Sequence, residues 1–148
     1  MARWAHEQER RILREGIPLP LESIPFAREV GIERPDEVRV LVTDPIPLPA
    51  PLWCVRIARK LGLPVFAPGG MALGKGVFLA NGHWGSLHHE LVHVWQYQSR
   101  GGMLPFFRQY LLECLMVGYV EAPLEMEARD LSCPSGLQRP EIHPSGPP

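Results

Sequence analysis

Residues 89–93 read His89-Glu90-Leu91-Val92-His93, and the apolar residues around them predict that they lie in a helix. Positions i and i+4 of an α-helix differ by about 40° around the axis, so His89 and His93 project from one face. Two imidazoles in this arrangement can both reach one ion at about 2.0–2.1 Å, the distance that zinc prefers. Glu90 is rotated away from direct coordination, yet it is close enough to act on water at the ion. The segment therefore predicts a zinc site with a general base beside it.

The helix that carries this segment is expected to run from Leu87 to Ser99. Ser86 suits the N-cap position, and the glycine pair Gly101-Gly102 is expected to end the helix. Val94 and Trp95 extend the apolar surroundings of the motif, which indicates that the helix is largely buried. Two buried imidazoles need partners, and one metal ion supplies a partner for both. The alternative, two surface histidines on an amphipathic helix, is therefore disfavoured.

A catalytic zinc site needs a third protein ligand, with the fourth position left to water. The downstream candidates are Glu113, Glu121, Glu125, Glu127 and His143. His143 lies in a stretch rich in Pro, Ser and Gly, which has little apolar surface to bury. Glu113 lies within an apolar helix, where it can instead be a buried partner of a ligand histidine.

Together with the first motif, the segment Glu125-Met126-Glu127-Ala128 resembles the gluzincin metallopeptidases. The resemblance is closest to the minimal single-domain members called minigluzincins, and it covers mainly residues 77–130. In gluzincins a glutamate from a later helix, often in a Glu-x-x-Ala motif, is the third ligand, and the resemblance gives this role to Glu125. Glu127 is the second candidate. Positions 125 and 127 differ by about 200° around a helix, so both side chains cannot face one ion.

The sequence departs from the gluzincin pattern after the third ligand. Members of the family often have an aspartate four residues after the ligand glutamate, where it orients a ligand histidine. This chain has Arg129 at that position and Asp130 one residue later. The residues that hold the histidines in place are therefore left open.

Two further features of the zincin fold have candidates in this chain. An edge strand that precedes the active-site helix binds extended substrate by strand addition, and the resemblance places it at residues 76–80. The same residues fit a plain core strand equally well. Tyr110, Tyr119 and Arg100 are candidate donors to a developing oxyanion.

The remaining pattern predicts an α+β domain with a small mixed sheet, an active-site helix and a following helix that carries the third ligand. Helices are expected at residues 4–14, 21–30, 53–61, 87–99, 105–119 and 123–131. Strands are expected at residues 37–43, 64–67 and 75–80. Residues 1–131 are expected to form a single zincin-like metallopeptidase domain, followed by a Pro-rich flexible tail at 132–148.

Composition excludes several function classes. The 148 residues carry a formal net charge of −1, so no basic surface indicates a nucleic-acid partner. No apolar run approaches the roughly 18 residues that span a bilayer, which argues against a membrane protein. The three cysteines, Cys54, Cys114 and Cys133, cannot all pair and lack metal-ligand spacing, so a reduced, cytoplasmic setting is expected. Nothing in the sequence predicts the oligomeric state.

These patterns predict a zinc metallopeptidase that acts on a peptide or protein substrate and holds one zinc ion per chain. The expected ligands are His89, His93 and Glu125, and Glu90 is the expected general base. The alternative is a zinc-bound interaction or regulatory domain that keeps a peptidase-like site without catalysis. A metal position open to water favours the enzyme, whereas four protein ligands favour the structural role.

Overall fold

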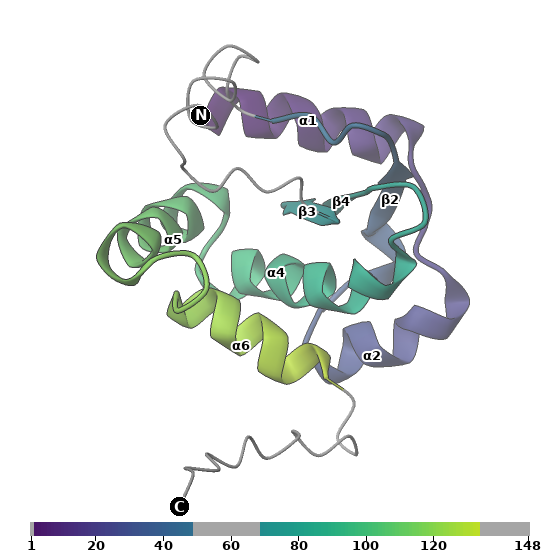
Figure 1. Cartoon of the computed structure of the whole chain (residues 1–148). Coiled ribbons are helices and arrows are strands. Elements are labelled where there is room, and N and C mark those ends of the chain that lie inside the picture. Colours follow the sequence, from purple (N-terminus) through teal and green to yellow (C-terminus); the bar gives the residue numbers. More distant parts are fainter. Residues whose placement is uncertain (1, 49–68, 134–148) are drawn as a thin grey trace, which may run out of the picture.

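The structure is a computed structural model of the chain and describes residues 2–48 and 69–133 (Figure 1). Within these ranges the fold is α+β, as predicted. The helices are α1 (Ala2–Glu15), α2 (Ile24–Glu29), α4 (Leu87–Ser99), α5 (Met103–Val117) and α6 (Pro123–Ser132). The strands are β1 (Ile17–Pro18), β2 (Arg39–Val42), β3 (Gly70–Leu73) and β4 (Gly76–Leu79). The helix expected at 53–61, the strand expected at 64–67, Cys54 and the tail from residue 134 lie outside the described residues.

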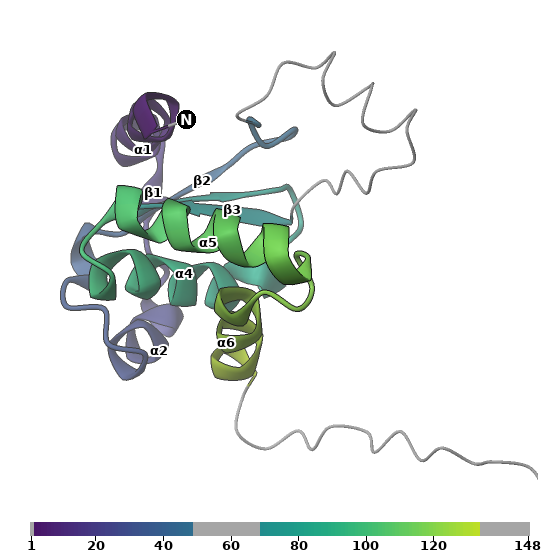
Figure 2. The same ribbon diagram turned by 90° about the vertical axis from the view of Figure 1, so that its left-hand side faces the viewer.

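The four strands form one mixed sheet in the order β1-β2-β4-β3. β2 is parallel to β4, whereas β1 pairs antiparallel with β2, and β3 pairs antiparallel with β4. Helix α1 lies on one face of the sheet and α4 on the other, with α2 and α6 below α4 (Figure 1). Figure 2 shows α5 running alongside α4 and the sheet, above α6. The helix with the motif is thus the central helix of the fold.

Strand β4 lies inside the sheet, so the expectation of an edge strand at residues 76–80 is wrong. All four of its residues are buried, because α1 covers one face of the strand and α4 the other. The edge strand on this side is β3. β3 pairs antiparallel with β4, with Gly70 opposite Leu79 and Leu73 opposite Gly76. The strand that comes first in the chain, β3, therefore lies at the edge of the sheet, and β4 lies inside it.

The turn between β3 and β4 is tied to α1. Gly74 has φ +60°, a left-handed conformation that glycine adopts without steric cost. The Glu9 side chain of α1 lies against this turn, where its Oε1 accepts a hydrogen bond of 3.0 Å from the Lys75 backbone N–H. A Cβ added at Gly74 would lie only 2.0 Å from that oxygen. The bare backbone of Gly74 thus leaves room for the Glu9 carboxylate, which a larger residue would have to displace.

The boundaries of the site helices follow their local sequence. Helix α4 has the predicted bounds, and Gly101 and Gly102 after it both have positive φ. Helix α6 begins with Pro123 in its first turn, as predicted. The Leu124 backbone N–H, which has no partner within that turn, donates to Glu113 Oε2 at 2.9 Å. Among the described residues, no helix is long and apolar enough to cross a membrane.

Substitution of Gly74 should destabilise the protein more than the same change at Gly82. Both glycines have positive φ, so alanine costs about 1–2 kcal/mol at either position. At Gly82 an added Cβ meets nothing within 4 Å, whereas at Gly74 it displaces Glu9. Loss of the Glu9–Lys75 hydrogen bond adds about 1 kcal/mol for Gly74→Ala. Urea denaturation of the two variants measures this difference, and equal unfolding free energies would contradict the Glu9 contact.

Candidate metal centre

Helix α4 has an apolar side that faces the sheet and a polar side that is also buried. Leu87, Leu91 and Val94 belong to the hydrophobic core. Glu90, His93 and Gln96 are buried as well, with 6%, 7% and 0% of their surface exposed. Buried polar groups are destabilising unless they are paired, so the neighbouring elements must supply partners.

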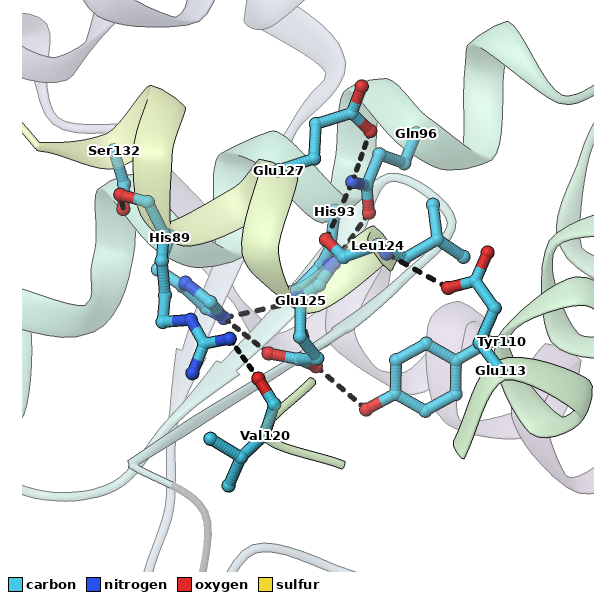
Figure 3. A network of polar contacts seen from close by, with 11 residues as sticks. His89, His93, Gln96, Tyr110, Glu113, Val120, Leu124, Glu125, Glu127 and Ser132 are labelled. Atoms are coloured by element: carbon cyan, nitrogen blue, oxygen red, sulfur yellow. Dashed lines mark hydrogen bonds and ion pairs between the residues drawn. The ribbon is translucent and has the colours of Figure 1, made fainter. Parts of the chain in front are cut away.

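Helix α6 brings Glu125 against the two histidines of the motif (Figure 3). His89 Nε2 lies 3.3 Å from Glu125 Oε2, and His93 Nε2 lies 3.4 Å from Glu125 Oε1. The two Nε2 atoms are 3.1 Å apart. The structure thus brings together the three residues that the sequence predicted as ligands, close enough to hold one metal ion.

These distances fit a tetrahedral metal ion. Ligand atoms at about 2.0–2.1 Å from such an ion lie roughly 3.3–3.4 Å from one another. The two Nε2 atoms, at 3.1 Å, are close to that separation, and one oxygen of Glu125 lies 3.3 Å from His89 Nε2 while the other lies 3.4 Å from His93 Nε2. Two imidazole nitrogens and one carboxylate oxygen also form a donor set that zinc sites use, with one position left for water.

The charges at the cluster favour a divalent cation. A cavity beside it is lined by residues of α1, β3, α4, α5, α6 and the loop before α6, and includes His89, Glu90, His93 and Glu125. Among the described residues no lysine or arginine lines this cavity, although two carboxylates do. Burial opposes ionisation of Glu125, but hydrogen bonds with His89 and His93 outweigh burial and hold its pKa well below the ordinary value. A 2+ ion would balance the two carboxylates.

Glu90 lies beside the cluster and against strand β3. Burial raises the pKa of Glu90, and the nearby His93 and His89 partly offset that rise. The Ala72 backbone N–H also donates to its carboxylate. A Cβ added at Gly70 would lie 2.6–2.8 Å from the Cγ, Cδ and Oε1 atoms of Glu90. The bare backbone of Gly70 therefore makes the space that the Glu90 carboxylate occupies.

Two of the three predicted oxyanion donors line the cavity. Tyr110 donates a hydrogen bond of 2.7 Å from its hydroxyl to Glu125 Oε1. Burial, and then Glu125, raise the pKa of Tyr119 to about 12, so its hydroxyl keeps its proton at neutral pH. Arg100 does not line the cavity, because its guanidinium pairs with Glu127 at 3.2 Å.

Sequence reasoning missed Gln96. Its Oε1 lies 2.8 Å from His93 Nδ1, and its Nε2 donates to Leu124 O at 2.9 Å and to Glu127 Oε2 at 2.7 Å (Figure 3). Glu127, the second ligand candidate, faces this amide and not the histidine pair. The only available signal was a polar residue three positions after His93 on a helix expected to be buried.

The other candidates near the site have different roles. Glu113 hydrogen bonds to the Leu124 backbone and to Gln109, so its expected contact with a ligand histidine is not formed. His88 stacks on Phe26 of α2 with ring centroids 4.2 Å apart. Arg129, at the position of the gluzincin aspartate, donates to the Val120 carbonyl. His143 lies outside the described residues.

Comparisons of the chain with protein-family models, with curated proteins and with solved structures gave no match. The gluzincin resemblance therefore rests on the motif residues of this chain. The metal-binding capacity rests on the geometry of the cluster.

Zinc binding should depend on all three residues of the cluster. We expect the purified protein to hold one zinc ion per chain, and His89→Ala or His93→Ala to lose most of it. Glu125→Ala should also weaken binding strongly, because it removes the only cluster ligand on α6. Glu121→Ala, an exposed neighbour just before the same helix, is the control and should bind zinc normally. Elemental analysis measures the zinc content, and competition with a chromophoric chelator measures the zinc affinity. Full zinc retention in both histidine variants would contradict the site.

Proposed function

We propose that the protein is a zinc-dependent hydrolase of the metallopeptidase type, with a peptide or protein as substrate. The observation that carries this proposal is Glu90, a buried carboxylate beside a three-ligand cluster and open to the same cavity. A structural zinc site has no use for an additional buried carboxylate that is not a ligand. A hydrolytic site needs one to accept a proton.

A zinc ion in such a site supplies a Lewis acid and lowers the pKa of water in its open position to near 7. His89, His93 and Glu125 would hold the ion. Glu90 is placed to take the proton from the attacking water and to pass it to the leaving amine. Gly70 and the Ala72 N–H fix the position of its carboxylate in the metal-free protein.

The cavity supplies the remaining groups that peptide hydrolysis requires. Tyr110 and Tyr119 line it, and their hydroxyls are the candidate donors to the oxygen that becomes negatively charged. Strand β3 forms the edge of the sheet and lines the same cavity. An extended peptide that enters the cavity would therefore run beside the outermost strand of the sheet in the described part of the chain, and an edge strand is the usual place for strand addition.

The second candidate function is a zinc-bound interaction domain that does not hydrolyse its partner. The small size of the chain favours this alternative, because zinc could serve chiefly to join α4 and α6. The contact between these helices passes directly through Glu125. The two functions differ in what they require of Glu90, and the next experiment uses that difference.

Glu90→Gln should abolish hydrolysis and leave zinc in place. The amide cannot accept a proton from water, so we expect the rate to fall by about 10²-fold or more. Glu29→Gln, the same change at an exposed position on α2, should leave the rate unaltered. The rates are measured on a peptide library with zinc-loaded protein. Loss of zinc from the Glu90 variant would make Glu90 a ligand, and an inactive wild type with bound zinc would favour the interaction domain.

Gly70→Ala should separate catalysis from metal binding by a different route. The new Cβ would push the Glu90 side chain away, and the three atoms nearest to it all belong to Glu90 and not to a metal ligand. A shift of about 1 Å in a catalytic group can lower the rate by on the order of 10²-fold. Gly85→Ala, where an added Cβ meets nothing within 4 Å, is the control. We expect reduced hydrolysis with unchanged zinc affinity, whereas parallel loss of both would place Gly70 in the structural framework of the metal site.

A further inference from the structure

A neutral histidine can bind a metal through Nε2 only when its proton is on Nδ1. In water both tautomers are populated, so a hydrogen-bond acceptor for Nδ1 raises the fraction of the neutral ring whose Nε2 is free to bind a metal. His93 has such a partner in Gln96 Oε1, at 2.8 Å. Both side chains are buried, so bulk water does not compete at this contact.

The hydrogen bonds of Gln96 decide which end of its amide faces the histidine. One end of the Gln96 amide lies 2.9 Å from the Leu124 carbonyl oxygen, which can only accept a hydrogen bond. The same end of the amide lies 2.7 Å from Glu127 Oε2. Rotation of the amide by 180° would place its oxygen against these two oxygens. The NH2 group therefore faces Leu124 and Glu127, and the amide oxygen faces His93 Nδ1.

Glu127 is itself fixed by a chain of polar contacts that runs through Arg100 and Gln109. Arg100 donates to Glu127 Oε2 at 3.2 Å and to Gln109 Oε1 at 3.1 Å. Gln109 donates to Glu113, which accepts from the Leu124 backbone N–H at 2.9 Å. The contacts thus form a closed ring through α4, α5 and α6, and this ring returns to Leu124, the neighbour of Glu125.

We propose that Gln96 is a positioning residue of the metal site: it holds the proton of His93 on Nδ1 and presents the Nε2 lone pair to the metal. Glu127 and Arg100 act through Gln96 by fixing the orientation of its amide. The proposal gives Gln96 the histidine-orienting role that the aspartate four residues after the third ligand has in gluzincins. It rests on the metal site of the proposed function and not on hydrolysis.

The zinc-loaded protein provides the first test. Long-range ¹H–¹⁵N correlation spectra show which ring nitrogen of a histidine carries a proton, and we expect His93 to bind zinc through Nε2 and to carry on Nδ1 a proton that exchanges slowly with water, because Gln96 accepts it. Zinc on Nδ1, or an Nδ1 proton that exchanges as fast as that of a surface histidine, would overturn the proposal without any variant.

A second test compares two glutamines on the same helix. Gln96→Met keeps the size of the side chain but removes the acceptor, so zinc affinity should fall about 10–100-fold. The Nδ1 proton of His93 in the zinc-loaded variant should also exchange faster with water, because it has lost its acceptor. Gln98→Met breaks contacts with Gly31 and Glu33, away from the cluster, and should leave zinc affinity and this exchange rate unchanged. Wild-type zinc affinity in a folded Gln96→Met variant would overturn the proposal, as would an unchanged exchange rate.

A third variant separates orientation from simple packing. Glu127→Ala leaves Gln96 in place but removes one of the two acceptors that fix its amide. An orienting role predicts weaker zinc binding than in Glu121→Ala, the exposed control. Equal zinc affinity of these two variants would indicate a packing role and would overturn the proposal. Should Gln96→Met not fold, Glu127→Ala and the Nδ1 proton of the wild-type protein decide the question. An inactive wild type would not affect these results, because every measurement is made without substrate.

Discussion

The fold depends on satisfying the buried polar side of α4. This helix is central, so Glu90, His93 and Gln96 are withdrawn from water together with the apolar residues on its other side. An unpaired polar group at such a position costs on the order of 1–3 kcal/mol, and a charged group costs more. The partners come from two elements: β3, whose backbone lies next to Glu90, and α6, which supplies Glu125 next to His93 and the Leu124 carbonyl next to Gln96. The contacts that hold α6 and β3 on α4 are therefore the same contacts that build the site.

The parts of the site that depend on helix periodicity could be predicted from the sequence. The spacing of His89 and His93 fixes a shared face, and the opposite directions of Glu125 and Glu127 allow only one of them to reach it. The order of the sheet was beyond such reasoning, because residues 70–73 and 76–79 are both short apolar segments between glycines. Only the structure shows that β4 pairs with β2 and so lies inside the sheet, and that Gly70 borders Glu90.

Gln96 illustrates a second limit of sequence reasoning. Only its position three residues after His93 distinguishes it from Gln98, two residues later on the same helix, yet Gln96 is fully buried and Gln98 is exposed. The partners of Gln96 are 28 and 31 residues away in the chain, on α6. The gluzincin pattern directed attention to the position four residues after Glu125, where Arg129 instead donates to the Val120 carbonyl. We propose that Gln96 of α4 fills here the histidine-orienting role that gluzincins give to that aspartate, because its amide oxygen lies 2.8 Å from His93 Nδ1.

The pKa values of the two carboxylates in the cavity, Glu125 and Glu90, are shifted in opposite directions. Both are buried, but Glu125 faces two imidazoles and a tyrosine hydroxyl, so hydrogen bonds outweigh burial and lower its pKa. Glu90 has the Ala72 N–H and only longer-range attraction from the same imidazoles, so burial dominates and raises its pKa. The first carboxylate is thereby held as an anion that suits a metal ligand, and the second as a group with greater affinity for a proton, as a general base requires. The opposite pKa shifts follow from the positions of the two side chains, because α6 directs Glu125 at the histidines whereas α4 directs Glu90 at the bare backbone of Gly70.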